Sequence, residues 1–116
     1  MTSSKPGRTR KELREYAMSQ LKTGAAGVEW FNQLSRDERI LLSGFRGGDF
    51  SKYRLDKINF RDFNLQETNF TSAKLKDACL RYADLKKSCF HSAKAQGINL
   101  LGSKSSDADL NGTQSA

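Results

Sequence analysis

The residues of this chain that could do covalent chemistry are two cysteines, Cys79 and Cys89, and the single histidine, His91. Cys89 and His91 lie two positions apart, and a thiolate beside an imidazole is a pair that nucleophilic enzymes use. Such a pair also needs a cleft that excludes water and a third group that orients the base. The pattern around these residues places both on one exposed edge, so we read them as solvated side chains and predict no catalytic residue and no enzyme activity.

Metal and cofactor sites are not expected either. Structural zinc sites need four ligands at recognisable spacing, and this chain offers two cysteines and one histidine. The segment GFRGGDF at residues 44–50 is rich in glycine. It lacks the lysine and the strand-then-helix context of a phosphate-binding loop. The sequence therefore predicts no metal ligand and no cofactor.

Anion binding is the remaining chemistry that the composition favours. The chain has 20 Lys and Arg against 13 Asp and Glu, a formal net charge of +7. Basic residues recur at a spacing of twenty, as Arg54, Lys74 and Lys94. A site made of them requires a backbone that returns to the same edge every twenty residues, and neither a single helix nor a flat strand does so.

A repeat of five residues supplies that backbone. Leu or Phe occupies twelve of fourteen positions spaced by five, and Ala95 and Ser105 are the exceptions. The twelve are Phe45, Phe50, Leu55, Phe60, Leu65, Phe70, Leu75, Leu80, Leu85, Phe90, Leu100 and Leu110. A strict period of five matches neither the 3.6 of a helix nor the 2 of a strand. It indicates a chain that turns at regular short intervals.

The other positions of the repeat have their own chemistry. The residue two before each Leu or Phe is mostly small, the one directly before is often Asp or Asn, and the two that follow are mostly polar or Gly. The segments TSAKLKDACLRYADLKKSCF and SSDADLNGTQ show this clearly. The pattern resembles that of the pentapeptide-repeat family, usually written A(D/N)LXX.

The resemblance implies a mainly β fold over residues 45–114, a right-handed quadrilateral β-helix with four pentads in each square coil. Fourteen pentads make three to four coils. Residues twenty apart then lie over one another, so Phe50, Phe70, Phe90 and Leu110 should form one interior column. Gly97, Gly102 and Gly112 predict looser coils at the carboxyl end, and Tyr53, Ile58 and Phe63 are bulky where the family has small residues.

Residues 9–44 lack the repeat and predict a helical cap. Thr9 and Glu12 have the spacing of a capping box, and a second helix is expected from about Ala25 to Leu34. Val28, Trp30, Phe31 and Leu34 should close the open tube, and docking a partner is the alternative for this cluster. Residues 1–8 are polar, contain the only proline, and are predicted to be disordered.

Stacked coils place the basic residues on one face, which is our candidate binding surface: Arg54, Lys57, Lys74, Lys76 and Lys94. Asp56 and Asp77 interleave with it, which favours a solvated basic face over a nucleic-acid or anion site. Some members of the family imitate DNA and occupy type II topoisomerases. The positive charge of this chain disfavours that function.

The reading that we favour is a non-enzymatic scaffold that binds proteins, in a bacterial cytoplasm and without a membrane segment. The carboxyl-terminal coil leaves an open solenoid end, and open ends associate readily. A homodimer through Leu100 to Leu110 is therefore possible, and we expect Leu101→Lys to disrupt it. Nucleic acid is the less favoured partner.

Overall fold

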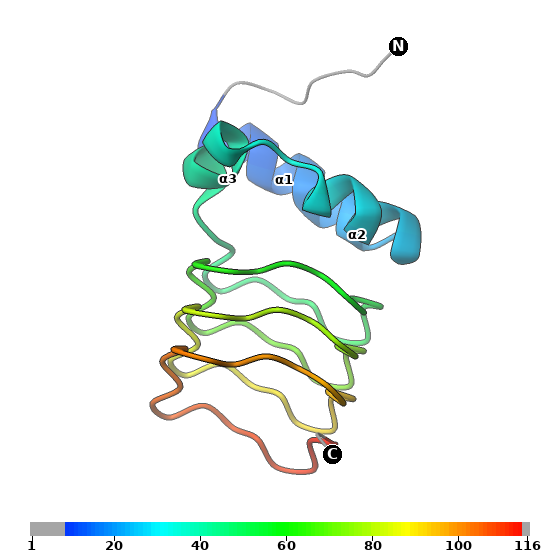
Figure 1. Ribbon diagram of the computed structural model, residues 1–116, viewed down its shortest axis with the longest axis vertical. Helices are drawn as coiled ribbons and strands as arrows, with labels where there is room; N and C mark the ends of the chain where they lie inside the picture. The colour runs from blue at the N-terminus through cyan, green and yellow to red at the C-terminus, as the bar shows by residue number, and fades with distance from the viewer. Residues whose placement is uncertain (1–8, 115–116) are drawn as a thin grey trace.

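The computed structural model describes residues 9–114, so the predicted disorder of residues 1–8 falls outside the described residues. Three helices come first: α1 (Arg10–Leu21), α2 (Ala25–Asn32) and α3 (Arg36–Leu42). They lie across one end of a stack of coils, and the last coil, drawn in red, lies at the opposite end of that stack (Figure 1). No helix among residues 9–114 is long and apolar enough to cross a membrane.

The first and third helices begin at capping boxes. The Thr9 hydroxyl accepts a hydrogen bond from the amide of Glu12, and the Glu12 carboxylate accepts one from the amide of Thr9. Ser35 and Glu38 make the same pair of bonds at α3. Helix α2 ends at Asn32, two residues before the predicted end, because the chain turns there to bring Ser35 to the start of α3.

The coils are held together by parallel bridges between residues twenty apart. Gly44 pairs with Asn64, Asn64 with Asp84, and Asp84 with Lys104, and the other columns follow the same rule. Each bridge involves a single residue, and residues 9–114 contain no continuous strand. The prediction of a mainly β chain needs this correction. Every pentad turns immediately after its bridge, which leaves no length for an extended strand.

The turn between pentads places the second residue after each Leu or Phe at positive φ. The carbonyl of Phe50 accepts a hydrogen bond from the amide of Tyr53 at 3.0 Å, and Lys52 within that turn has φ +65°. This is the arrangement of a type II β-turn, which favours glycine at the same position. Gly97 and Gly102, both at φ +73°, occupy it. In the structure these glycines suit the positive φ of the turn. The sequence analysis had instead predicted looser coils from them.

Phenylalanine rings form the centre of the core. Phe50 and Phe70 stack with ring centroids 5.2 Å apart, and Phe70 and Phe90 stack at 4.9 Å. All three side chains are buried. Leu110 was predicted to extend this column, but it is 51% exposed, as no described coil covers it. Leu100 is 39% exposed for the same reason.

The helices close the opposite end of the tube. Phe31 of α2 is fully buried and lies 5.4 Å from Phe60 and 5.5 Å from Phe63, between ring centroids. Phe63 is one of the bulky residues at a position where the repeat has small side chains. Its size therefore fills the space between the first coil and the helices.

Candidate functional site

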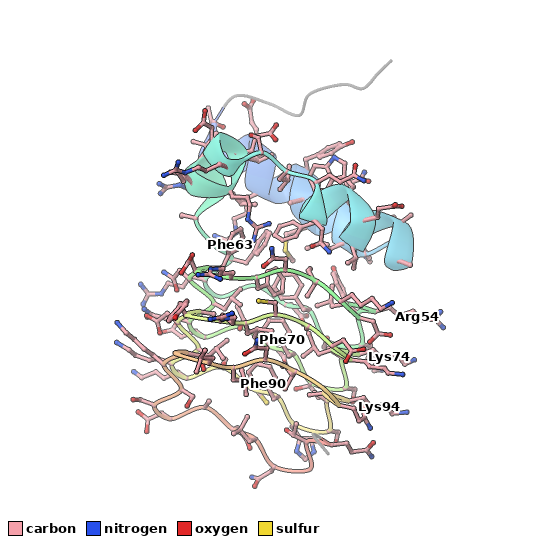
Figure 2. All side chains as sticks on the ribbon, viewed as in Figure 1. Arg54, Phe63, Phe70, Lys74, Phe90 and Lys94 are labelled. Atoms are coloured by element: carbon pink, nitrogen blue, oxygen red, sulfur yellow. The ribbon has the colours of Figure 1, made fainter. Side chains whose placement is uncertain are left out.

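Three of the five predicted basic residues share one edge of the stack. Arg54 is bridged to Lys74, and Lys74 to Lys94, in a single column that we call the basic column. Figure 2 shows the three labelled side chains extending from the same edge of successive coils. Arg54 and Lys94 are exposed, and Lys74 is half-buried. Neighbouring members of such a column are about 4.8 Å apart along the stack.

The other two predicted residues, Lys57 and Lys76, are exposed and lie beside carboxylates. The amide of Lys76 donates a hydrogen bond to Asp56 at 2.9 Å. Asp77 occupies the position after Lys76 and lies directly under Gly97. The interleaved acids were expected, and they make this part of the face nearly neutral. The structure thus concentrates the unpaired positive charge in the basic column.

The structure adds two lysines that the sequence analysis missed. A groove of about 410 Å³ lies between the α1–α2 turn and the first coil, and we call it the cap groove. Its lining is Lys22, Thr23, Gly24, Ser51, Lys52, Tyr53 and Arg54. Lys52 could have been found, since it is two residues from Arg54. Lys22 could not, because only tertiary packing brings the helical segment to Arg54.

A second basic cluster lies on a different face. The guanidinium groups of Arg61 and Arg81 lie over the ring of Tyr82, at 5.2 and 5.6 Å from its centroid. Arg61 also pairs with Asp62 at 3.5 Å. The sequence analysis passed over this cluster, although Arg61 and Arg81 are twenty residues apart. Its arginines are engaged by the ring and by the carboxylate, which leaves less charge for a ligand.

Arg39 of α3 serves packing. Its guanidinium lies 4.8 Å from the centroid of Phe63 and 5.1 Å from that of Phe31, and it donates a hydrogen bond to the carbonyl of Asn59. Burial lowers the pKa of Arg39 from its ordinary value, and the charge of Asp62 opposes this. These contacts join the third helix to the first coil.

The cysteines and the histidine are not assembled into a site. Cys79 is bridged to Asn59 and Cys89 to Asn69, so the two thiols belong to different columns. The sulfur of Cys89 lies 3.4 Å from the Thr71 hydroxyl, and His91 is exposed. Within residues 9–114, no three His, Cys, Asp or Glu side chains gather as metal ligands.

The far end of the tube forms an apolar hollow of about 190 Å³, which we call the mouth. It is lined by Leu85, Phe90, Ala95, Ile98, Leu100, Ser105, Ala108, Leu110 and Thr113. Leu101, which the sequence analysis chose for substitution, is 59% exposed but is absent from this lining. The apolar residues that a second copy would cover are therefore Leu100 and Leu110.

Comparison with solved structures finds proteins whose overall similarity to this chain is modest. Rfr23 from the cyanobacterium Cyanothece 51142 is 24% identical with a TM-score of 0.40, and the match covers 63% of this chain and 53% of that one. A protein of the Arabidopsis thaliana thylakoid lumen is 26% identical with a TM-score of 0.40, over 60% and 59% of the two chains. HetL from the cyanobacterium Nostoc sp. strain PCC 7120, which is involved in heterocyst differentiation regulation, is 23% identical with a TM-score of 0.35, over 60% and 37% of the two chains.

All three are described as pentapeptide-repeat proteins, and this chain spans less than two thirds of the length of each. No curated protein matches the chain. The family model for pentapeptide repeats matches residues 54–91 with eight copies. Those residues include Phe70 and Phe90 of the stacked phenylalanines and two members of the basic column, Arg54 and Lys74. Residues 54–91 of this chain therefore belong to the pentapeptide-repeat family.

Proposed function

We propose that this protein is a non-enzymatic interaction module whose first partner is a second copy of itself, bound mouth to mouth. The proposal includes a right-handed quadrilateral β-helix of about three and a half coils, counted from fourteen pentads at four to a coil. A cytoplasmic location remains a prediction from the sequence. The observation that carries the proposal is the pattern of unpaired backbone groups at the last coil.

In the inner coils, the residues directly before and after each bridged residue form backbone hydrogen bonds with the next coil. The carbonyl of Ala78 accepts from the amide of Asn99 at 2.9 Å, and the amide of Leu80 donates to the carbonyl of Asn99 at 2.8 Å. At the last coil the same groups have no partner among residues 9–114. They are the carbonyls of Ile98, Ser103 and Ala108 and the amides of Leu100, Ser105 and Leu110.

This pattern matches a second copy related by a two-fold axis. A two-fold axis perpendicular to the stack reverses the direction in which the chain runs around the coil, so facing segments become antiparallel. In an antiparallel pair, the carbonyl before one residue and the amide after it bond to the equivalent groups of the partner. Ile98 and Leu100 flank Asn99 in this way. The unpaired groups of one copy therefore complement those of another, as an isologous interface requires.

The net charge and the apolar surface of the last coil also favour a second copy as the partner. Residues 95–114 contain one Lys and two Asp, a net charge of 1 − 2 = −1, whereas the whole chain carries +7. Two mouths can therefore meet without the repulsion that other faces would produce. Contact would also remove Leu100 and Leu110 from water, which favours association.

The test is the molar mass by sedimentation equilibrium as protein concentration rises. We expect wild type to pass from the 13.0 kDa chain toward twice that mass. Leu110→Lys places a charge in the mouth and should keep the protein monomeric. Leu101→Lys is the matched control, because it makes the same change outside the mouth lining and should leave the dimer in place.

The circular dichroism spectra of both variants must match the wild-type spectrum, which shows that the fold is retained. A wild type that remains monomeric at every concentration, or a dimer equally sensitive to both substitutions, would contradict mouth-to-mouth pairing.

A second function is favoured by the basic column. Exposed cations held in register cost free energy unless they are hydrated or meet an anion. The bridges of Arg54 to Lys74 and of Lys74 to Lys94 hold them in such a row. We propose anion binding along this edge as a property separate from dimerisation, since the mouth lies at another part of the molecule. Binding that weakens steeply as salt rises would support it.

A further inference from the structure

The cap groove is a strongly positive hollow. Three of its lining residues carry positive charge: Lys22, Lys52 and Arg54. No residue of the lining carries a carboxylate. Among residues 9–114, no ion pair involves any of the three cations. Their charge is therefore available to a ligand.

Packing between the helices and the coil holds the cations together. Gly24 has φ +96° and lies so close to the first coil that a Cβ there would be 4.0 Å from the side chain of Arg54. Lys52 has φ +65°, and its amide donates to the carbonyl of Thr71 at 2.9 Å. The backbone that carries each cation is thus fixed by the fold.

Hydroxyl groups supply the directional donors that an oxyanion needs. Ser51 and Tyr53 line the same groove with their hydroxyls. Thr23 also lines it, but its hydroxyl already donates to the carbonyl of Gln20 at 2.7 Å. Burial, together with the negative charge of Asp49, raises the pKa of Tyr53, so its hydroxyl stays protonated at neutral pH. Tyr53 is held in place against Phe50, with ring centroids 5.6 Å apart.

Asp49 is the carboxylate that opposes an anion here. Its Oδ1 accepts a hydrogen bond from the amide of Ser51 at 3.0 Å, which holds the pKa of Asp49 below its ordinary value and keeps it charged. Asn occupies the same repeat position at several other pentads. Asp49→Asn should therefore remove the charge and keep the turn.

The groove opens onto the basic column through Arg54, which belongs to both. From there Lys74 and Lys94 continue along the edge of the stack (Figure 2). Five cations thus form one track, about 10 Å long over the two coil steps from Arg54 to Lys94, with a wider end at the groove. A single small anion would use the groove alone. A chain of phosphates would use both parts.

Resting on the anion-binding function proposed above, we infer that the cap groove anchors a linear chain of phosphate groups, which then follows the basic column. Phosphates offer charge for the lysines and acceptors for the hydroxyls. Two sources share this chemistry, the phosphodiester backbone of a single-stranded nucleic acid and the phosphoanhydride chain of inorganic polyphosphate.

The test is fluorescence anisotropy with a labelled twelve-residue oligothymidylate over a series of salt concentrations. We expect the paired change Lys22→Gln with Lys52→Gln to weaken binding at least ten-fold. It should also lower the slope of log affinity against log salt by about 1.4, as two lost contacts to a single strand would. Asp49→Asn should strengthen binding.

The matched control is Lys86→Gln with Lys87→Gln. These two lysines are exposed on another face, and Lys87 shares the positive φ of Lys52. Equal weakening by the control would show that net charge alone binds the probe and would overturn the groove. The groove would also be overturned if changing Lys74 and Lys94 to Gln abolished binding whereas changing Lys22 and Lys52 to Gln had no effect. The basic column would then remain an anion site. No binding at low salt would reject both.

Competition then identifies the source. Unlabelled polyphosphate that displaces the oligonucleotide supports recognition of the phosphate chain, and the tighter of the two ligands is assigned as the source. Polyphosphate that fails to displace it would overturn the inference, because the bases would then carry the binding.

Discussion

Asp and Asn precede many of the interior Leu and Phe residues because their side chains cap the turn that follows. The Oδ1 of Asn69 accepts from the amide of Thr71 at 3.0 Å, and Asn59 and Asp109 make the same bond to the residue two positions later. Such short side chains bond to nearby backbone more readily than longer ones. The preference in the sequence therefore has a local cause that does not depend on a ligand.

The interior phenylalanines give the first stability prediction. Phe70 is fully buried and stacks on both Phe50 and Phe90. Phe70→Ala should lower the free energy of unfolding by about 3–5 kcal/mol, the usual cost of removing a buried ring. Phe70→Leu should cost less than half of that, because Leu is the other residue that the repeat uses here. Urea unfolding measures both.

If Phe70→Leu were as costly as Phe70→Ala, ring stacking rather than burial would govern the column. Phe60, which is buried but outside this stack, offers the control for the same pair of changes.

At the scale of elements, the join between helix α3 and the first coil depends on Gly44. This residue is bridged to Asn64, and a Cβ at Gly44 would lie 2.2 Å from the Asn64 carbonyl oxygen. Gly44→Ala must push the first coil away from the second. We expect a loss of about 3 kcal/mol, at the upper end of overpacking costs.

Gly47→Ala is the comparison for that change. Gly47 has φ +75° and nothing within 4 Å of an added Cβ, so only backbone strain of about 1–2 kcal/mol is expected. Equal losses of unfolding free energy in the two variants would show that the close approach at Gly44 has no energetic weight.

The elements also show what the sequence could and could not predict. The five-residue period predicted which residues share a column, and Arg54, Lys74 and Lys94 follow it. The capping residues Thr9 and Glu12 predicted where α1 begins. The place of Lys22 in the lining of the cap groove could not be predicted, because it depends on how the helices pack and not on any period.

An open solenoid end was expected, but the period alone did not predict which of its interior positions are exposed. The period placed Leu100 and Leu110 in the interior, and their positions in the repeat are interior ones. Whether an interior position is buried depends on the presence of a next coil, and the period gives no information about that. The residues 9–114 supply no coil beyond Leu110.

The whole molecule has two unlike ends. The helices lie at one end of the stack and the last coil at the other (Figure 1). Phe31 is buried at the helical end, and Leu100 and Leu110 are exposed at the mouth. A solenoid whose described end leaves backbone donors and acceptors unpaired favours edge association. Mouth-to-mouth pairing would leave the helices outermost and the basic column on the side, so dimerisation and anion binding can be measured separately.

The most direct test of this account is amide hydrogen exchange, followed residue by residue by NMR at high and low protein concentration. The account predicts that the amides of Leu100 and Leu110 exchange slowly at high concentration and quickly at low concentration. The amide of Leu80, bonded to Asn99 within one chain, should exchange slowly at both. Fast exchange of Leu100 and Leu110 at every concentration, with Leu80 protected, would contradict the mouth as an interface between two copies.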